Sequence, residues 1–275
     1  METIGIIIIG LLELVRMAIV GRSSTTYRIE SQLMYAPLQR IVARISNRKN
    51  VFVFGARDAG KSTMLASLIH YISNNAVYEY RRDPVANPDG VKVIRAMNEA
   101  AERGGFPDKT LPDVCSEVKI QYRRRDKSDT QCFFFQEIPG EKVVRFDPVN
   151  EEHKQIDGCT QDFFLSSVGA IIVASSKPEY HKEKEAINDF LEWLYRTKYN
   201  RPILFLLTKY DLISNAFNNE VQAANAIYRN SIGLLACDNT STVLPFSVGI
   251  VKDDKIIQNQ INDFVPPLIK WLESL

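Results

Sequence analysis

The sequence predicts a three-layer α/β fold, in which helices cover both faces of a mostly parallel sheet. Short apolar runs typical of buried strands alternate with amphipathic helical stretches along most of the chain. The first of these strands runs directly into a glycine-rich loop, and a helical stretch follows that loop at once. Later strands end in polar clusters, which a parallel sheet would bring to one edge.

Composition is that of a soluble globular protein. The chain has 275 residues, of which 45% are hydrophobic and 24% are charged, so we expect one large domain with appendages. The formal net charge of +1 gives no reason to expect nucleic-acid binding. Four cysteines and three histidines are scattered without metal-ligand spacing. They favour reduced thiols in the cytoplasm and no metal cage built from Cys and His.

Residues 1 to 22 form an apolar N-terminal segment, METIGIIIIGLLELVRMAIVGR. A helix over its apolar run would be about 26 Å long, which is marginal for a membrane span. Glu2, Glu13 and Arg16 share one narrow face of that helix, which suits a helix lying in a membrane interface or packed in an oligomer. We expect a cytoplasmic protein that associates with a membrane, or with further copies of itself, through this segment.

Residues 23 to 49 are expected to contain a basic amphipathic helix, with apolar residues on one face and arginines elsewhere. Packing on the domain is the simpler interpretation, and docking to a membrane surface or a partner is the alternative.

Residues 50 to 275 are expected to form the α/β domain. Six strands are predicted, at 51 to 54, 117 to 125, 130 to 137, 170 to 175, 202 to 207 and 243 to 247. The second and third should form an antiparallel hairpin, because a short polar turn joins them. Helices are expected near 62 to 72, 178 to 196, 214 to 231 and 257 to 274, the last one broken by Pro266 and Pro267. Residues from about 75 to 113, with a helix predicted at 90 to 103, are too many for a simple connection and form an insertion.

The glycine-rich loop GARDAGKST, residues 55 to 63, fits the pattern G-x-x-x-x-G-K-[ST]. In this pattern backbone N–H groups surround the phosphates of a nucleotide, the lysine reaches the β and γ oxygens, and the next hydroxyl ligates Mg²⁺. The pattern assigns these two roles to Lys61 and Ser62. The expected nucleotide contacts are Gly55, Arg57, Asp58, Ala59, Gly60, Lys61, Ser62 and Thr63.

A second cluster, QEIPGEK at 136 to 142, follows the Phe-rich strand. Phosphate-binding α/β proteins hold Mg²⁺ with an acidic residue at such a strand end, and a following glycine N–H can contact a γ-phosphate. Glu137 is the expected metal ligand and Gly140 the expected phosphate contact. A simple strand-to-turn connection is the alternative.

A third cluster, TKYD, follows the strand at 202 to 207 and indicates which base is bound. The carboxylate of Asp211 could accept two hydrogen bonds from N1 and N2 of guanine, and adenine cannot supply these donors. Thr208 and Lys209 complete this cluster.

At the next strand end, in LPFSVG, a backbone N–H of Ser247 or Val248 could contact the O6 atom of guanine. Four clusters in chain order, each at the carboxyl end of a strand, predict a guanine-nucleotide site.

With these clusters the sequence resembles the Ras-like GTPases of the translation-factor-related class, which includes small G proteins and the α subunits of heterotrimeric G proteins. The resemblance covers roughly residues 50 to 250, and GARDAGKS and TKYD are its most specific parts. It implies GTP or GDP and Mg²⁺ as ligands, and a first switch whose threonine ligates Mg²⁺, for which Thr110 is best placed. The long switch segment with PDKTLP most resembles the bacterial double GTPases of conflict systems.

Two positions depart from the family pattern. Glu137 stands where the family has aspartate, so a contact with Mg²⁺ through water is expected. Glu141 stands where the family has a water-orienting glutamine or histidine, and its carboxylate brings negative charge towards the γ-phosphate. We therefore expect slow hydrolysis, with Lys61, Thr110 and Glu141 as the catalytic residues.

The two charged residues inside the glycine-rich loop, Arg57 and Asp58, are expected to have different roles. Asp58 occupies a position where some relatives carry Asp or Asn that helps hold a monovalent cation, so K⁺ could replace an arginine finger. Arg57 stands where small G proteins keep glycine, and its bulk argues against an arginine inserted by a partner. The three arginines at the hairpin turn, residues 123 to 125, are expected to be solvated.

The expected function is a GTP-binding switch that slowly hydrolyses GTP to GDP and signals to an effector protein as the segments around Thr110 and Gly140 become ordered. A non-hydrolysing nucleotide-binding assembly module is the alternative, for which Glu137 and Glu141 argue. An ATP-dependent enzyme with the same loop is a third possibility, and TKYD argues against it.

Overall fold

The computed structural model describes residues 49 to 81, 116 to 137, 166 to 177, 181 to 196, 200 to 228, 241 to 252 and 255 to 275, and a few positions between these ranges. The N-terminal helices predicted within 1 to 49 therefore lie outside the described residues. So does most of the helix predicted at 90 to 103, of which Arg95, Glu99 and Glu102 are described and are helical. Within the described ranges, none of the helices combines the length and the apolar composition needed to cross a bilayer.

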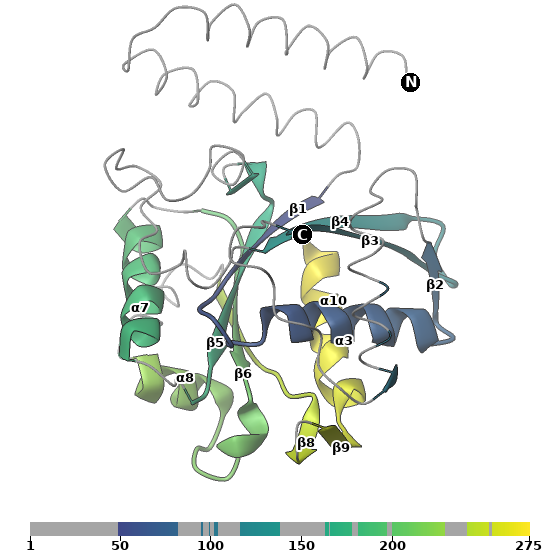
Figure 1. Cartoon of the computed structure of the whole chain (residues 1–275). Coiled ribbons are helices and arrows are strands. Elements are labelled where there is room, and N and C mark those ends of the chain that lie inside the picture. The colour runs from purple at the N-terminus through teal and green to yellow at the C-terminus, as the bar shows by residue number, and fades with distance from the viewer. Residues whose placement is uncertain are drawn as a thin grey trace, which may run out of the picture.

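A seven-stranded sheet with the order β2-β3-β4-β1-β5-β6-β7 forms the centre of the fold (Figure 1). The strands are β1 (Lys49–Phe54), β2 (Tyr78–Arg81), β3 (Ser116–Arg124), β4 (Thr130–Glu137), β5 (Gly169–Ser175), β6 (Ile203–Thr208) and β7 (Ser241–Pro245). Pairing is parallel from β4 through β1, β5 and β6 to β7. Strand β3 is antiparallel to both β4 and β2. The predicted mostly parallel sheet with an antiparallel hairpin is confirmed.

The prediction of six strands is wrong, because β2 adds a seventh at the edge beyond β3. It lies within the segment predicted as an insertion. Its sequence YEYR alternates tyrosines, which pack against the core, with charged residues, but four residues are too short a run to mark a strand by pattern alone. Its pairing with β3 places Glu79 opposite Arg123, and the two side chains form an ion pair. The hydrogen bond from Arg123, followed by its charge, lowers the pKa of Glu79.

Two of the hairpin arginines, which were expected to be solvated, are partly exposed and also form ion pairs. Arg123 is paired with Glu79, and Arg124 donates hydrogen bonds of 3.0 and 2.9 Å to the two carboxylate oxygens of Asp126. Both guanidinium groups therefore form ion pairs close to the turn of the β3–β4 hairpin.

Helices cover both faces of the sheet (Figure 1), α3 (Lys61–Asn74) and α10 (Ile261–Ser274) on one face and α7 (His181–Arg196) and α8 (Glu220–Tyr228) on the other. The apolar run of strand β1 contributes side chains to the cores on both faces of the sheet. Val51 and Val53 belong to the core beneath α3 and α10, whereas Phe52 and Phe54 belong to the core beneath α7 and α8. All four side chains are fully buried, as expected for a central strand of a sheet covered on both faces.

The last helix begins later than predicted and is not broken. It begins at Ile261 and continues through Pro266 and Pro267 to Ser274. A proline inside a helix removes a backbone hydrogen bond and costs about 3 kcal/mol. Burial of the opposite face, which includes Val265, Leu268, Ile269 and Leu272, offsets this cost.

Two further strands precede this helix, β8 (Gly249–Lys252) and β9 (Lys255–Asn259), and pair as a separate antiparallel hairpin. The sequence prediction placed 257 to 259 in the helix and had no strand here, so this is a second correction.

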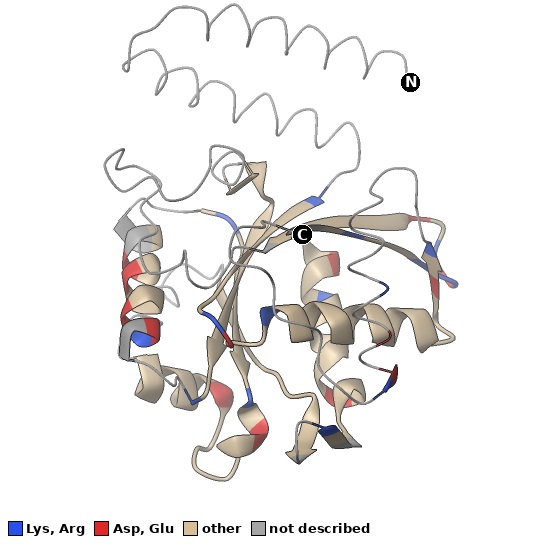
Figure 2. Ribbon diagram, in the orientation of Figure 1, with Lys and Arg blue, Asp and Glu red and all other residues tan. Residues whose placement is uncertain are grey.

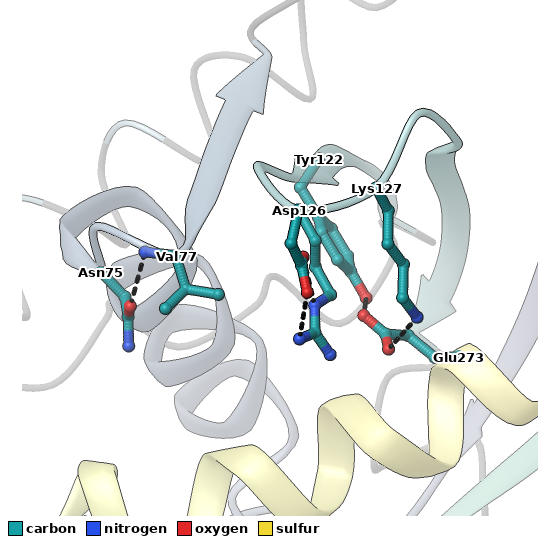
Figure 3. A network of polar contacts seen from close by, with 7 residues as sticks. Asn75, Val77, Tyr122, Asp126, Lys127 and Glu273 are labelled. Atoms are coloured by element: carbon teal, nitrogen blue, oxygen red, sulfur yellow. Dashed lines mark hydrogen bonds and ion pairs between the residues drawn. The ribbon is translucent and has the colours of Figure 1, made fainter.

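Glu273, near the end of α10, ties that helix to the β3–β4 hairpin (Figure 3). The hydroxyl of Tyr122 donates a hydrogen bond of 3.5 Å to its carboxylate, and Nζ of Lys127 lies 4.0 Å from the same group. Burial, followed by the charge of Glu273, raises the pKa of Tyr122. The Tyr122 hydroxyl therefore stays protonated and remains a donor.

Helix α7, on the other face of the sheet from α10, carries several acidic residues (Figure 2). Acidic residues follow one another along α7 at Glu183, Glu185, Asp189 and Glu192. Burial, followed by repulsion from Glu185 and Glu192, raises the pKa of Asp189.

Candidate functional site

The carboxyl ends of β4, β1, β5, β6 and β7 lie at one edge of the sheet, because these five strands are parallel. Strand β1 has β4 on one side and β5 on the other. After β1 the chain forms β2, β3 and β4 on one side of that strand, and it then crosses to form β5, β6 and β7 on the other side. Open α/β sheets bind ligands at such a switch point.

Residues 55 to 60 form a tight loop between β1 and α3 at this switch point. A Cβ atom on Gly55 would lie 2.4 Å from the carbonyl oxygen of Val173 in β5, so a side chain at this position would collide with backbone. Gly60 caps α3 with a φ of 96°, in the left-handed region, and no side chain caps the helix. The first N–H groups of α3 have no acceptor within the helix, and such groups bind anions well.

Lys61 is the first residue of α3, and only 5% of its surface is exposed. Its ammonium group donates hydrogen bonds of 2.9 Å to the carbonyl oxygens of Gly55 and Ala56. These contacts fix a positive charge across the loop, beside the positive end of the helix dipole. The predicted phosphate-binding residues therefore form one compact group.

Arg57 and Asp58 occupy the exposed side of the loop. Nε of Arg57 lies 3.7 Å from the carboxylate of Asp58, and the side chains are 58% and 39% exposed. An ion pair this exposed contributes little to stability. Asp58 has a φ of 58°, an uncommon value for a residue with a side chain.

The TKYD cluster, which is predicted to bind the base, begins at the last residue of β6. The hydroxyl of Thr208 lies 2.6 Å from the carbonyl oxygen of Ala59 and 3.2 Å from that of Ala174. Ala59 belongs to the glycine-rich loop, so the clusters predicted to bind phosphate and base are in direct contact. Lys209 follows with a φ of 56° and precedes a short 3-10 helix, Tyr210–Leu212, which contains Asp211.

Ser247, which follows β7, contacts the same cluster from the neighbouring strand. Its hydroxyl donates a hydrogen bond of 2.6 Å to Oδ1 of Asp211 and accepts one of 2.9 Å from the N–H of Gly249. The Ser247 side chain therefore orients the Asp211 carboxylate. The sequence had predicted a backbone role for Ser247 and Val248, and this side-chain contact was missed.

Ser176 is a residue that sequence reasoning missed entirely. Its hydroxyl donates a hydrogen bond of 2.7 Å to the carbonyl oxygen of Lys209, and its N–H donates one of 2.9 Å to that of Thr208. The sequence offers only two serines at the end of an apolar run, and these belong to no motif.

Ser62 and Glu137, two predicted metal ligands, belong to neighbouring segments. Ser62 lies in the first turn of α3, and Glu137 is the last residue of β4, paired with Val53 of β1. A hydroxyl and a carboxylate are oxygen donors of the kind that Mg²⁺ prefers, so these residue types fit the ion. Thr110, Gly140 and Glu141 lie outside the described residues, and their roles stay predictions.

Together these features define the class of protein: an α/β protein with a glycine-rich loop, of the pattern predicted to bind phosphate, at the switch point of a parallel sheet. No protein-family model matches the sequence, and no curated protein matches it. Among solved structures, the chain is similar to Roco2 RocCORdC of Methanosarcina barkeri bound to GDP, with a TM-score of 0.41 and 18% sequence identity. The match covers 83% of this chain and 50% of that one, so the chain spans half the length of that structure.

Proposed function

We propose that the protein is a GTP-binding switch that slowly hydrolyses GTP to GDP and phosphate. The observation that carries this proposal is the 2.6 Å hydrogen bond from Thr208 to Ala59. It joins the glycine-rich loop to the TKYD cluster, so one ligand with a phosphate chain and a base can contact both. In support, Lys61 lies across the loop that would hold the phosphates.

Guanine is the base that the cluster suits. Asp211 would accept hydrogen bonds from N1 and N2 of guanine, with its carboxylate oriented by Ser247. Adenine has no donor at N1 and no amino group at C2. We propose GTP and GDP as the ligands, and the same pairing argues against an ATP-dependent enzyme.

Hydrolysis of GTP transfers the γ-phosphoryl group to water. The water oxygen forms a bond to the γ-phosphorus, the bond to the bridging oxygen breaks, and GDP and inorganic phosphate leave. Mg²⁺, for which we propose Ser62, Thr110 and Glu137 as ligands, neutralises phosphate charge when bound. Glu141 would orient the water while adding negative charge, which supports a slow rate.

Arg57 and Asp58 are proposed to add to the charge around the phosphates, Arg57 directly and Asp58 by holding K⁺. Effector binding would depend on the segments around Thr110 and Gly140, which GTP would order. We further propose a cytoplasmic location, with residues 1 to 22 as the contact to a membrane or to other copies of the chain.

The test of the guanine assignment is nucleotide binding by the full chain and by Asp211→Asn. We expect wild type to prefer GDP over ADP by more than about a hundredfold. The Asn amide donates a hydrogen bond where the carboxylate accepted one, and xanthine has a carbonyl at C2 instead of an amino group, so Asp211→Asn should prefer XDP over GDP. Asp263→Asn, an exposed carboxylate on α10, is the matched control. Equal binding of ADP and GDP by wild type would overturn the assignment.

Single-turnover assays test hydrolysis itself. GTP that binds with Mg²⁺ but is never cleaved would favour the non-hydrolysing assembly module. Glu141→Gln removes the negative charge and keeps a group that can orient water, so its rate should equal or exceed that of wild type. A clear slowing would contradict the role proposed for Glu141.

A further inference from the structure

The turn that ends β5 supports the base-recognition cluster from the neighbouring strand. Strands β5 and β6 are paired up to their last residues, Ser175 and Thr208. The next residues, Ser176 and Lys209, therefore leave the sheet side by side. Ser176 donates its N–H to the carbonyl of Thr208 at 2.9 Å and its hydroxyl to the carbonyl of Lys209 at 2.7 Å. Because Ser176 is only 5% exposed, water competes little for these bonds.

Lys209 is the residue that needs this support. Its φ of 56° lies in the left-handed region, which a residue with a Cβ atom adopts only at a cost in free energy. Its carbonyl oxygen accepts a second hydrogen bond, of 3.1 Å, from the N–H of Leu212. Ser176 and Leu212 thus hold the same carbonyl, and Asp211 lies in the turn that these bonds close.

The turn that ends β5, which contains Ser175 and Ser176, is itself held by a residue of α8. The hydroxyl of Tyr228, the last residue of that helix, donates a hydrogen bond of 2.7 Å to the carbonyl of Ser175. Burial, followed by the charge of Glu183, raises the pKa of Tyr228, so this hydroxyl stays protonated. The Ser175 hydroxyl differs from that of Ser176, because it bonds within its own turn, to the carbonyl and N–H of Lys177 at 3.0 and 3.2 Å.

We propose that Ser176 is a positioning residue for guanine recognition, whose hydroxyl holds Lys209 in the conformation that directs Asp211 towards the base. The inference rests on the proposed function. Ser176 acts through Lys209 and Asp211 and does not contact the nucleotide. A displaced carboxylate cannot keep both hydrogen bonds to N1 and N2, so Ser176 also contributes to discrimination against hypoxanthine, which lacks the 2-amino group.

The experiment measures the Kd of GDP and of IDP for the full-length protein and three variants. Ser176→Ala should weaken GDP binding by about three- to tenfold, the effect of one hydrogen bond, while IDP binding changes less. The preference for GDP over IDP should therefore fall. Ser176→Thr keeps a hydroxyl and should keep most of the preference. Ser175→Ala is the matched control, and both Kd values should stay at the wild-type level.

Two results would overturn the inference while the proposed function stands. The first is an unchanged preference for GDP over IDP in Ser176→Ala. The second is a loss of GDP and IDP affinity by the same factor, because a general loss of structure acts on both ligands equally. If wild type binds neither GDP nor IDP, the proposed function fails and the inference fails with it. Should Ser176→Ala not fold, Ser176→Cys, with a similar shape and a much weaker donor, replaces it.

Discussion

The hydroxyl of Tyr122 on β3 donates a hydrogen bond to Glu273 on α10, across 3.5 Å (Figure 3). The contact joins the last helix to the β3–β4 hairpin. The two segments predicted as switches precede β3 and follow β4 in the sequence. The hairpin that connects these segments is therefore anchored to α10 at the end away from the glycine-rich loop.

The buried tyrosines predict an alkaline loss of stability. Burial raises the pKa of Tyr122 and of Tyr228 above the ordinary value. Each tyrosine therefore contributes its full share of the stability below about pH 10. This stabilisation is lost as pH rises further, because the unfolded chain then releases protons that the folded protein keeps. Each tyrosine should lower the free energy of unfolding by up to about 1.4 kcal/mol per pH unit above that point. Urea unfolding from neutral pH to about pH 11 measures this loss.

The variants Tyr122→Phe and Tyr228→Phe should each flatten that decline, because phenylalanine does not ionise. At neutral pH each should also cost about 1 kcal/mol for the lost hydrogen bond. Parallel pH profiles for wild type and both variants would contradict the predicted shift.

Thr208→Val should weaken both stability and nucleotide binding. The change removes the donor that joins β6 to the carbonyl of Ala59 and leaves a buried acceptor without its partner. We expect a loss of about 1 to 3 kcal/mol in the free energy of unfolding, with weaker GDP binding in titrations. Thr242→Val, at an exposed position on β7, is the control and should change neither. Normal stability and affinity in Thr208→Val would show that the two clusters do not depend on this bond.

The glycines at the two ends of the loop should differ in their tolerance of alanine. In Gly55→Ala the new Cβ atom would lie 2.4 Å from the backbone of β5, which cannot move without disturbing the sheet. In Gly60→Ala the nearest atom is 3.5 Å away, and the cost comes from the positive φ. We expect about 2 to 4 kcal/mol for Gly55→Ala and about 1 to 2 kcal/mol for Gly60→Ala. Chemical denaturation would contradict this ranking if Gly60→Ala were the less stable variant.

Pro267→Ala should stabilise the protein. Pro267 lies inside α10 on its exposed side, so alanine restores a backbone donor without opening a cavity. The free energy gained from the better helix propensity of alanine exceeds the free energy lost because the unfolded chain becomes more flexible without the proline. We therefore expect a net stabilisation of about 1 to 2 kcal/mol. Lys270→Ala, on the exposed side of the same helix, should stay within about 0.5 kcal/mol of wild type. A lower melting temperature for Pro267→Ala would show that the proline is needed for packing.

The parts of the fold that the sequence predicts are those that local patterns specify. The apolar run before Gly55 and the glycine pattern after it identify the strand, the loop and the start of α3 without tertiary information. The Phe-rich strand is found at 130 to 137, as predicted, because its apolar residues form a continuous run.

Features that depend on contacts with another segment were not predictable from a single apolar run or motif. Ile256, Ile257 and Ile261 have a spacing compatible with a helix, and KIIQN becomes a strand because it pairs with β8. In the candidate site, Asp211 was found from its motif, but Ser176 was not. Its hydroxyl bonds a residue 33 positions further along the chain, and no motif marks such a contact.

The short strand β2 has a consequence for self-association. It is the last of the described strands on its side of the sheet, and its Glu79 carboxylate lies between Arg123 and Arg81, 3.8 Å from the latter. A foreign strand that added to this edge would have to strip water from all three charges. This edge is therefore a poor template for amyloid-like growth.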